Sequence, residues 1–368
     1  MRRLSFQAQL GERIVVVSDI HAHLSYLKAL FQEIDLQPQD HLIILGDFIN
    51  RGEDSLECLR YVKDLRDRPS TYILKGNHEH FVEMILESSD NLKAFEDFYG
   101  KGYYETLFNA MLNHENTSLS DFKTPSDLYD FFHETYKEEI DFIKSLDIIL
   151  EDKDYLFVHG GYDASFKEDE VFKFLKYDEF DRLSPVQDKT VVVGHWPACN
   201  LREDKLDNRP YFNPHKNLIF VDGGLGIKSS GELSCLIIHK MSDGDHYSSV
   251  QVNAFQEAVI VKERHYDQED HVFISYPNNE IKLLHQGQDM SQGLHIHTGK
   301  TFTVFNDMLV EKDKGHALKG NYSNHFLNLD LGKRVFRVNQ VGDYVLVKCE
   351  DDFGWVHKDQ LEDVKNEE

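Results

Sequence analysis

Acidic, amide and imidazole side chains cluster at five places in the first two hundred residues. A site for two divalent cations needs several carboxylate, imidazole and carbonyl ligands, with one carboxylate able to bridge both ions. A single Asp or His in a loop is usually a solvated or capping residue, but five such clusters together predict a metal site. The clusters are Asp19-x-His21, Gly46-Asp47, Gly76-Asn77-His78-Glu79, His159-Gly160-Gly161 and Gly194-His195.

Six short apolar runs must position these clusters. Each run is rich in apolar and β-branched residues and ends in a polar cluster, and a segment with helical spacing follows each of the first three. Open α/β sheets place their ligand crevice at the carboxyl ends of the strands, so we expect the clusters to converge on one spot. The sequence therefore predicts an α/β domain with mixed sheets flanked by helices. The runs occupy residues 14–17, 42–45, 72–74, 155–158, 191–193 and 218–221.

The residue pattern changes twice along the chain. Residues 88–144 are acidic, rich in aromatic residues and helical in character, and we interpret them as a helical insertion that covers the site. After residue 245, turn residues separate short strands with no long helical pattern. We therefore predict a first domain at 1–245, which carries all five clusters, and a small β-rich module at 246–368. The end of this module, at 335–356, resembles the closing strands of an SH3-like barrel.

Composition argues against several classes of protein. The 40 basic and 65 acidic residues give a formal charge of -25, which argues against a surface that grips nucleic-acid backbones or anionic lipid. The four cysteines lack the paired spacing of a zinc ribbon or a disulfide framework. No run approaches the roughly 20 apolar residues of a membrane span. We expect a cytoplasmic protein with no nucleic-acid partner and no membrane partner.

The five clusters resemble the signature blocks of the calcineurin-like metallophosphoesterases, over roughly residues 13–240. The blocks read SDIHAH at 18–23, GDFINRG at 46–52, GNHE at 76–79, HGG at 159–161 and GHWP at 194–197. The resemblance implies two divalent metal ions that share Asp47 as a bridge. Mn is our first expectation, with Fe or Zn as alternatives, because mixed oxygen and nitrogen ligands suit all three. The implied ligands are Asp19, His21 and Asp47 for one ion, and Asp47, Asn77, His159 and His195 for the other.

The resemblance also implies a reaction. Two cations roughly 4 Å apart lower the pKa of a bridging water toward neutrality and clamp the phosphoryl oxygens, so a metal-bridged hydroxide would hydrolyse a phosphoester. The guanidinium of Arg51 is suited to bind two phosphate oxygens. His78 would contact the substrate and protonate the leaving oxygen as a general acid. The segment 174–180 resembles a stretch that usually supplies a second phosphate-binding arginine. Tyr177 or Lys176 stands there, and Tyr177 is our candidate for substrate binding.

Two positions depart from the common form of these blocks. Pro197 stands where some branches have a further metal-binding His, which favours phosphoprotein phosphatases and symmetrical dinucleoside tetraphosphate hydrolases over nucleases. Most phosphoprotein phosphatases read GDxxDRG, whereas this chain has Asn50 at the second Asp. The Asn50 carbonyl could accept a hydrogen bond from His78 but cannot raise the pKa of that His electrostatically. We therefore expect Asn50 to make a weaker general acid of His78 and to favour leaving groups that depart easily.

Three functions compete on these observations. The chain is most like a serine/threonine protein phosphatase, because GNHE and HGG are typical of that group. The alternative is a symmetrical dinucleoside polyphosphate hydrolase, since those enzymes also lack an Asp at position 50. The third is of another class, a weakened phosphate-binding scaffold whose C-terminal module docks a protein partner or a second copy. The substrate would be a phosphorylated protein or a nucleotide, and Asp47→Asn separates an enzyme from a scaffold.

Overall fold

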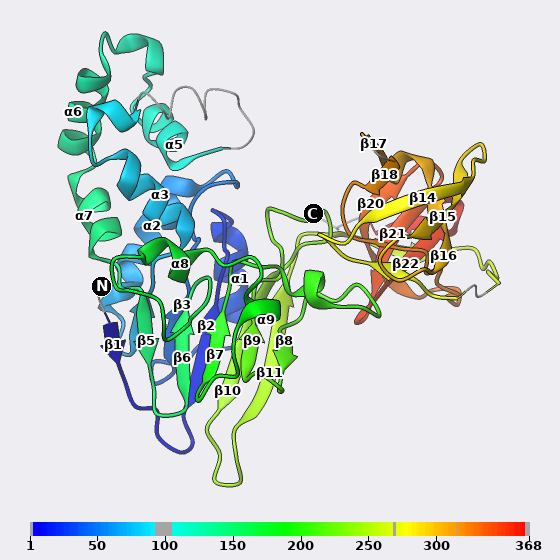
Figure 1. Cartoon of the computed structure of the whole chain (residues 1–368), viewed down its shortest axis with the longest axis horizontal. Coiled ribbons are helices and arrows are strands. Elements are labelled where there is room, and N and C mark those ends of the chain that lie inside the picture. Colours follow the sequence, from blue (N-terminus) through cyan, green and yellow to red (C-terminus); the bar gives the residue numbers. More distant parts are fainter. Residues whose placement is uncertain (1–2, 93–104, 268–269, 314, 365–368) are drawn as a thin grey trace. The chain divides into compact units, whose positions relative to one another are not determined.

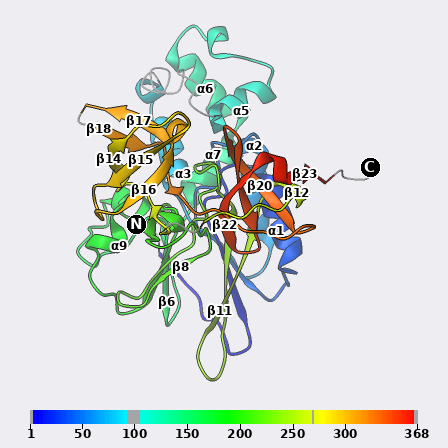
Figure 2. The same ribbon diagram turned by 90° about the vertical axis from the view of Figure 1, so that its right-hand side faces the viewer.

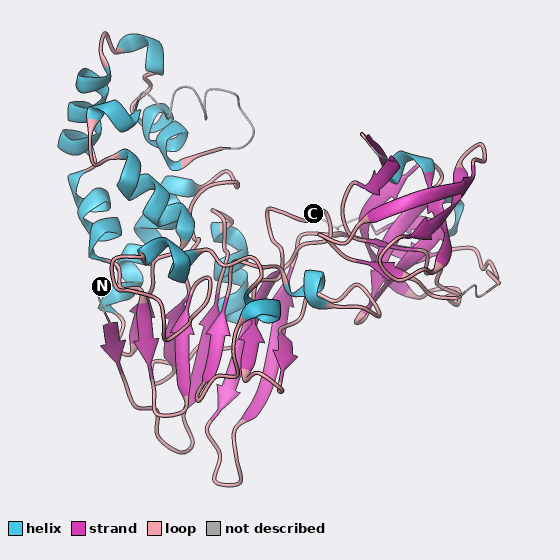
Figure 3. Cartoon of the chain, viewed as in Figure 1, coloured by secondary structure: helices cyan, strands magenta, loops and turns pink. Residues whose placement is uncertain are grey.

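The computed structural model describes residues 3–92, 105–267, 270–313 and 315–364. The chain divides into two compact units. In the described residues the first unit mixes helices with strands, whereas the second is built mainly of strands (Figure 3). The first unit comprises Met1–Pro197, Arg209–Gly226 and Gly231–Val252, and the second comprises Ala198–Asn208, Ile227–Ser230 and Asn253–Glu368.

Two mixed sheets form the centre of the first unit (Figure 1). One sheet has the strand order β1-β5-β6-β7-β9-β8, and the other has the order β11-β10-β2-β3-β4. The first contains β1 (Arg3–Ser5), β5 (Ile149–Glu151), β6 (Tyr155–Val158), β7 (Thr190–Val193), β9 (Leu218–Phe220) and β8 (Tyr211–Asn213). The second contains β11 (His246–Val252), β10 (Leu233–His239), β2 (Arg13–Val17), β3 (His41–Ile44) and β4 (Thr71–Ile73).

Strand β2 is apolar throughout its buried part because both of its faces are covered. Successive side chains of a strand point to opposite faces of the sheet. Ile14 and Val16 belong to the core cluster that also contains residues of the six-stranded sheet, such as Phe157. Val15 and Val17 belong instead to the core cluster formed with the helices. The two sheets therefore pack face to face, and helices cover the outer face of the five-stranded sheet.

The helices of the first unit follow the strands in the predicted βα order. β2, β3 and β4 are parallel, and α1, α2 and α3 follow them in turn. The predicted α/β fold with mixed sheets and flanking helices is thus confirmed. Among the helices described, none combines the length and the apolar content that a membrane crossing requires. The bounds are α1 (Leu24–Glu33), α2 (Ser55–Asp64), α3 (Asn77–Ile85), α8 (Val171–Leu175) and α9 (Phe180–Leu183).

Three further helices lie in the segment that we interpret as an insertion, although its residues 93–104 are outside the described residues. They are α5 (Leu107–His114), α6 (Pro125–Thr135) and α7 (Lys137–Ser145). Threonine caps begin two of them, because Thr106 accepts a hydrogen bond from the Asn109 N–H and Thr124 accepts one from the Asp127 N–H. In both Figures 1 and 2, α5 and α6 lie together at one end of the unit.

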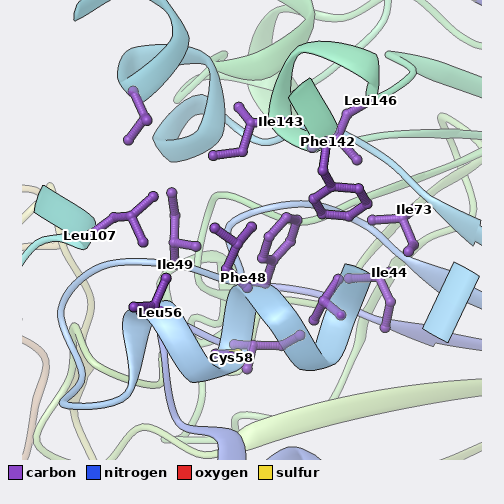
Figure 4. Packing of buried hydrophobic residues seen from close by; sticks show 14 of the residues in the cluster. Ile44, Phe48, Ile49, Leu56, Cys58, Ile73, Leu107, Phe142, Ile143 and Leu146 are labelled. Carbon is purple, nitrogen blue, oxygen red and sulfur yellow. The ribbon is translucent and has the colours of Figure 1, made fainter. Parts of the chain in front are cut away.

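The loop that follows β3 is anchored in the helical core. Phe48 and Ile49 are fully buried, and their side chains point toward Leu107 and Phe142 (Figure 4). The rings of Phe48 and Phe142 lie 6.3 Å apart between centroids. Because Phe48 and Ile49 separate Asp47 from Asn50, this packing fixes both polar residues at the edge of the sheet.

In the part of the second unit that the structure describes, the strands form two antiparallel five-stranded sheets and one two-stranded sheet. The predicted all-β character of the C-terminal part is thus confirmed, while its likeness to an SH3-like barrel stays a prediction. Cys199 and Leu206, which follow the GHWP block, pack in the same core cluster as Trp355. The sheets contain β22 (Asp352–His357), β21 (Tyr344–Cys349), β20 (Arg334–Val341), β12 (Gln256–Ile260) and β23 (Leu361–Asp363); β16 (Thr301–Phe305), β15 (Met290–His295), β14 (Glu280–His285), β18 (Gly315–Leu318) and β17 (Leu309–Lys312); and β13 (Phe273–Ile274) and β19 (Tyr322–Ser323).

Candidate metal centre

The polar clusters meet where the strands of both sheets end. Asp47 belongs to two groups of side chains whose candidate ligand atoms all lie within 4.8 Å of one another. One group adds His21 and His78, and the other adds His159 and His195. A single carboxylate shared between two groups is the arrangement that a bridged pair of ions requires.

Short distances and nearly complete burial define the site. His159 Nε2 lies 3.3 Å from Asp47 Oδ2 and 3.1 Å from Asn77 Oδ1. His21 Nε2 lies 3.9 Å from Asp19 Oδ1. Asp19, His21, Asp47 and His159 are each at most 1% exposed. These oxygen and nitrogen atoms therefore face one another in a space from which water is largely excluded.

Two of these buried atoms lack a hydrogen-bond partner in the described part of the protein and are free to bind a cation. Asp19 Oδ1 and His21 Nε2 find no hydrogen-bond partner among the described residues. Buried polar atoms are almost always paired, and a buried charge without compensation is costly. Carboxylate oxygen and imidazole nitrogen are suitable ligands for Mn²⁺, Fe²⁺ or Zn²⁺. The donor set thus fits divalent metal ions, although the assignment of each ligand stays a prediction.

The ionisable groups influence one another strongly. Burial raises the pKa of Asp19 to about 6, whereas it lowers the pKa of His21 well below its usual value. Burial alone would also raise the pKa of Asp47, but the surrounding histidines, His159 first, hold it well below its usual range. Burial disfavours the charge of His159, yet the negative Asp47 and Asp19 raise its pKa to about 10. Without a metal ion, protonated His159 thus supplies the positive charge that the buried carboxylates require, a part that divalent cations can take.

Each predicted histidine ligand has a partner for one of its ring nitrogens. His159 Nδ1 lies 2.7 Å from the carbonyl oxygen of Leu45, and His21 Nδ1 lies 3.5 Å from that of Ile49. His195 differs, because its Nε2 lies 2.7 Å from Oδ1 of Asp178. A partner on one nitrogen fixes which nitrogen is left for a metal. Asp178 is not predictable from the sequence, because nothing in its local pattern connects it with His195, 17 positions later.

Glu79, the last residue of the GNHE block, holds two of the site's loops together. Its Oε2 accepts hydrogen bonds from the N–H groups of Asp47 and Gly76 at 2.8 and 2.9 Å. Its Oε1 accepts hydrogen bonds from Phe48 and Ile49 at 3.0 and 3.3 Å. Burial raises the pKa of this carboxyl to about 7, with Asp47 the second cause, while the N–H groups oppose the shift.

The backbone of these loops adopts an unusual conformation. Non-glycine residues rarely have positive φ angles, and such residues concentrate at functional sites. Gly194 shows how closely the loops approach, because a Cβ atom there would lie 1.9 Å from Ser18 Oγ. Six predicted site residues have positive φ angles, namely Asp19 (53°), His21 (46°), Asp47 (51°), Asn50 (65°), Arg51 (76°) and His195 (63°).

The structure corrects the expected role of the Asn50 carbonyl. Asn50 Oδ1 accepts a hydrogen bond from the backbone N–H of Leu107 at 2.7 Å, and it is not the atom of Asn50 that lies against the His78 ring. The Nδ2 group of Asn50 instead lies 3.0 Å from His78 Nδ1. Because an amide nitrogen can only donate, His78 Nδ1 must be the acceptor in this contact. Burial, with Arg51 as a secondary cause, lowers the pKa of His78 to about 4.

The two residues predicted to bind the phosphate lie in different surroundings. Arg51 is partly buried, and its backbone N–H donates to the carbonyl oxygen of Glu105 at 2.8 Å. Tyr177 packs its ring against Phe166 and Phe180, with both pairs of ring centroids 5.6 Å apart. Arg51 is near enough to His21 and His78 to lower the pKa of both. The substrate contacts of Arg51 and Tyr177 stay predictions.

A comparison with known families decides the class of this protein. The model of the calcineurin-like phosphoesterase family matches residues 12–222, more than half of the chain. The chain belongs to this family. The predicted resemblance is thereby confirmed, and membership of this family supports the prediction of a phosphoester hydrolase. Calcineurin-like phosphoesterases use a binuclear centre of divalent metals, and the two groups around Asp47 supply candidate ligands for it.

Individual relatives match shorter stretches. A symmetrical bis(5'-nucleosyl)-tetraphosphatase from Actinobacillus pleuropneumoniae is 40% identical over 73 residues, 19% of this chain and 26% of that protein. A putative serine/threonine-protein phosphatase from Caenorhabditis elegans is 38% identical over 68 residues, 18% of this chain and 19% of that protein. The solved structure of a putative diadenosine tetraphosphatase gives a TM-score of 0.43 at 16% identity, over 68% of this chain and 97% of that one. The chain thus matches about a quarter of the length of the symmetrical tetraphosphatase.

Proposed function

We propose that this chain is a two-metal phosphohydrolase that prefers substrates with weakly basic leaving groups, nucleoside polyphosphates first. The observation that carries the proposal is the contact between Asn50 and His78. Of the two substrates weighed from the sequence, phosphoprotein and dinucleoside polyphosphate, this contact favours the second.

The ligands in this proposal are those expected from the sequence. Asp19, His21 and Asp47 would hold one ion, and Asp47 with Asn77, His159 and His195 would hold the other. When bound, the two ions would activate a water molecule and neutralise charge on the phosphoryl oxygens. Arg51 would bind two phosphate oxygens through its planar guanidinium.

His78 has a restricted part in this mechanism. Because Asn50 donates to Nδ1, the single proton of the neutral His78 ring is on Nε2. An Nε2–H group can donate a hydrogen bond to an oxygen of the substrate. Transferring that proton completely would leave an imidazolate, whereas a general acid at neutral pH normally begins as an imidazolium. His78 would therefore stabilise the leaving oxygen without fully protonating it.

The basicity of the leaving oxygen then decides which substrates react quickly. A phosphate group has a second pKa of about 6 and departs without a proton. A tyrosine phenol has a pKa of about 10, and an alkyl alcohol such as serine is more basic still. Phosphoanhydrides should therefore react fastest, aryl phosphates more slowly and phosphoserine most slowly.

A second candidate, hydrolysis of basic phosphopeptides, is favoured by the charge of a neighbouring cavity. The cavity has a volume of about 540 Å³, and Gly52, the residue after Arg51, is among the residues that line it. Exposed carboxylates of Glu53, Asp54, Glu57 and Glu105 line it. Such a surface repels a polyphosphate and attracts lysine or arginine next to a phosphorylated residue.

The test is one set of rates measured with the Mn²⁺-loaded protein at neutral pH. The substrates are diadenosine tetraphosphate, an aryl phosphate, and phosphoserine and phosphothreonine peptides with basic or acidic flanks. We expect cleavage of the tetraphosphate to two ADP to be fastest. Faster turnover of the basic phosphopeptides would refute the proposal and support the second candidate. No turnover of any substrate by protein with bound metal would favour the scaffold interpretation.

A further inference from the structure

The three predicted histidine ligands are held in two different ways. Neutral backbone carbonyl groups lie against His21 and His159. These carbonyls belong to Ile49 and Leu45, which both lie in the loop that follows β3. His195 instead contacts a charged side chain, because Asp178 Oδ1 lies 2.7 Å from its Nε2. Asp178 lies between α8 and α9, in a segment with no metal ligand of its own.

We propose that Asp178 is a positioning residue that orients His195 and tunes its affinity for a metal ion. With Asp178 as the partner of Nε2–H, the ring nitrogen left for a cation is Nδ1. A carboxylate on the far nitrogen fixes the tautomer and raises the basicity of the histidine as a ligand. This inference rests on the proposed two-metal centre and adds a residue to it.

The surrounding structure fixes the segment that carries Asp178. The N–H groups of Gly160 and Gly161 donate to the carbonyl oxygen of Phe174 at 2.7 and 3.2 Å. Phe174 is buried, and so is Phe180 on the other side of Asp178. The end of α8 is thus tied to the loop that begins with the predicted ligand His159. These hydrogen bonds and the two buried rings fix the backbone on both sides of Asp178.

The backbone of His195 is fixed separately from its ring. Its N–H donates to Asp19 Oδ2 at 2.9 Å, which sets the position of the Cα atom. Rotation about χ1 and χ2 is still available to the imidazole. The contact with Asp178 removes this remaining freedom.

The competing interpretation is an ordinary surface ion pair. The side chain of Asp178 is 44% exposed, and Lys176 Nζ lies 3.6 Å from its carboxylate. Exposed ion pairs contribute little to stability, so this interpretation predicts no effect on metal binding. A partner of a ligand histidine instead changes metal affinity about 10- to 100-fold.

The experiment is calorimetric titration of metal-free protein with Mn²⁺, with no substrate present. We compare the wild type, Asp178→Ala and Asp178→Asn. The control is Glu179→Gln, an exposed neighbour whose carboxylate bonds to Arg182 and not to a histidine. We expect the affinity for one of the two Mn²⁺ ions to fall about 10- to 100-fold in Asp178→Ala and less in Asp178→Asn, while the control is unchanged.

A double-mutant cycle with His195→Ala separates orientation of His195 from a general effect of charge. We expect Asp178→Ala to cause no further loss of affinity in the His195→Ala background. Equal losses in both backgrounds would overturn the proposal, and so would an affinity within twofold of the wild type for Asp178→Ala. Unfolding midpoints in EDTA should be the same in wild type and Asp178→Ala, which shows that the variant is folded. Because no substrate is present, the result does not depend on which phosphoester is hydrolysed.

Discussion

The side chain of Asn50 joins three parts of the site through its two polar atoms. Its oxygen accepts from Leu107, the first residue of α5, and its nitrogen lies against His78. An amide can serve both contacts only if it donates to His78. The same position occupied by a carboxylate would accept both bonds and would favour the imidazolium form of His78.

Asn50→Asp should therefore increase the rate on alkyl phosphomonoesters. A general acid contributes about 10²- to 10⁴-fold, so we expect at least about a tenfold gain in kcat with phosphoserine peptides. The rate with a phosphoanhydride should change little. Asn116→Asp, which introduces the same charge at an exposed residue just after α5 and outside the acidic cavity, is the matched control. An unchanged phosphoserine rate would contradict this account of His78.

The low pKa of His78 also predicts how stability depends on pH in the metal-free protein. Burial is the main cause that lowers this pKa to about 4, whereas an unfolded histidine titrates near 6.5. Between these values the unfolded chain binds a proton that the folded chain does not. The contribution of His78 is thus fully present above about pH 6.5 and is lost as the pH falls toward 4.

His78→Gln should flatten this pH dependence. The measurement is urea unfolding in EDTA at several pH values between 7 and 4.5, for the wild type and the variant. We expect the difference in free energy of unfolding between the two proteins to change across this range. An identical slope in both would mean that His78 is not kept neutral by the fold.

Among the elements of the fold, helix α3 holds the site together, because its residue Glu79 joins the loops after β3 and β4. Four backbone N–H groups donate to this one carboxylate. Those loops carry Asp47 and Asn77, so the carboxylate sets the distance between two predicted ligands. Phe48 and Ile49 also anchor the loop after β3 in the hydrophobic core (Figure 4).

Glu79→Gln should weaken both the fold and the metal site. The new amide NH₂ group would face two backbone N–H donors, and leaving buried donors without an acceptor costs about 1–3 kcal/mol. We expect a lower unfolding midpoint and a lower Mn²⁺ affinity. The control is Glu87→Gln, an exposed residue just after α3. A variant with wild-type affinity would exclude Glu79 as a determinant of the site.

The elements and most of the candidate site were predictable because they depend on local sequence. A run of apolar residues predicts strand β2, and the block SDIHAH predicts the polar site residues directly after it. Contacts across long stretches of sequence were not predictable. The Asn50 side chain accepts a hydrogen bond from Leu107, 57 residues later. The orientation of the Asn50 amide therefore depends on where α5 begins. The exposed Asp178 has no apolar periodicity or motif to connect it with His195.

At the scale of the whole molecule, the second unit has its own core, which includes part of the chain after the GHWP block. Cys199 is fully buried in the cluster that contains Trp355. The Trp355 ring lies 4.7 Å from Phe305 between centroids, and its Nε1–H donates to the carbonyl oxygen of Ser323 at 2.8 Å. The thiol of Cys199 therefore reports on the integrity of this unit.

Trp355→Ala should expose Cys199 to labelling. Loss of a buried Trp costs about 3–5 kcal/mol, which is enough to open the core of a small unit. We expect a thiol reagent to modify Cys199 faster in this variant, as located by mass spectrometry. Phe336→Ala, which removes a 40% exposed ring from the same unit, is the control. Equal labelling rates in both variants would show that Trp355 does not hold this core.

The central claim is a pair of metal ions joined by Asp47, and the most direct measurement is the number of ions bound. Metal-free wild type and Asp47→Asn are titrated with Mn²⁺ in a calorimeter, with Asp64→Asn, an exposed residue of α2, as the control. We predict two ions per chain for the wild type and the control. Asp47→Asn should lose tight binding together with phosphoester hydrolysis. Two tightly bound ions in Asp47→Asn, or fewer than two in the wild type, would contradict the account.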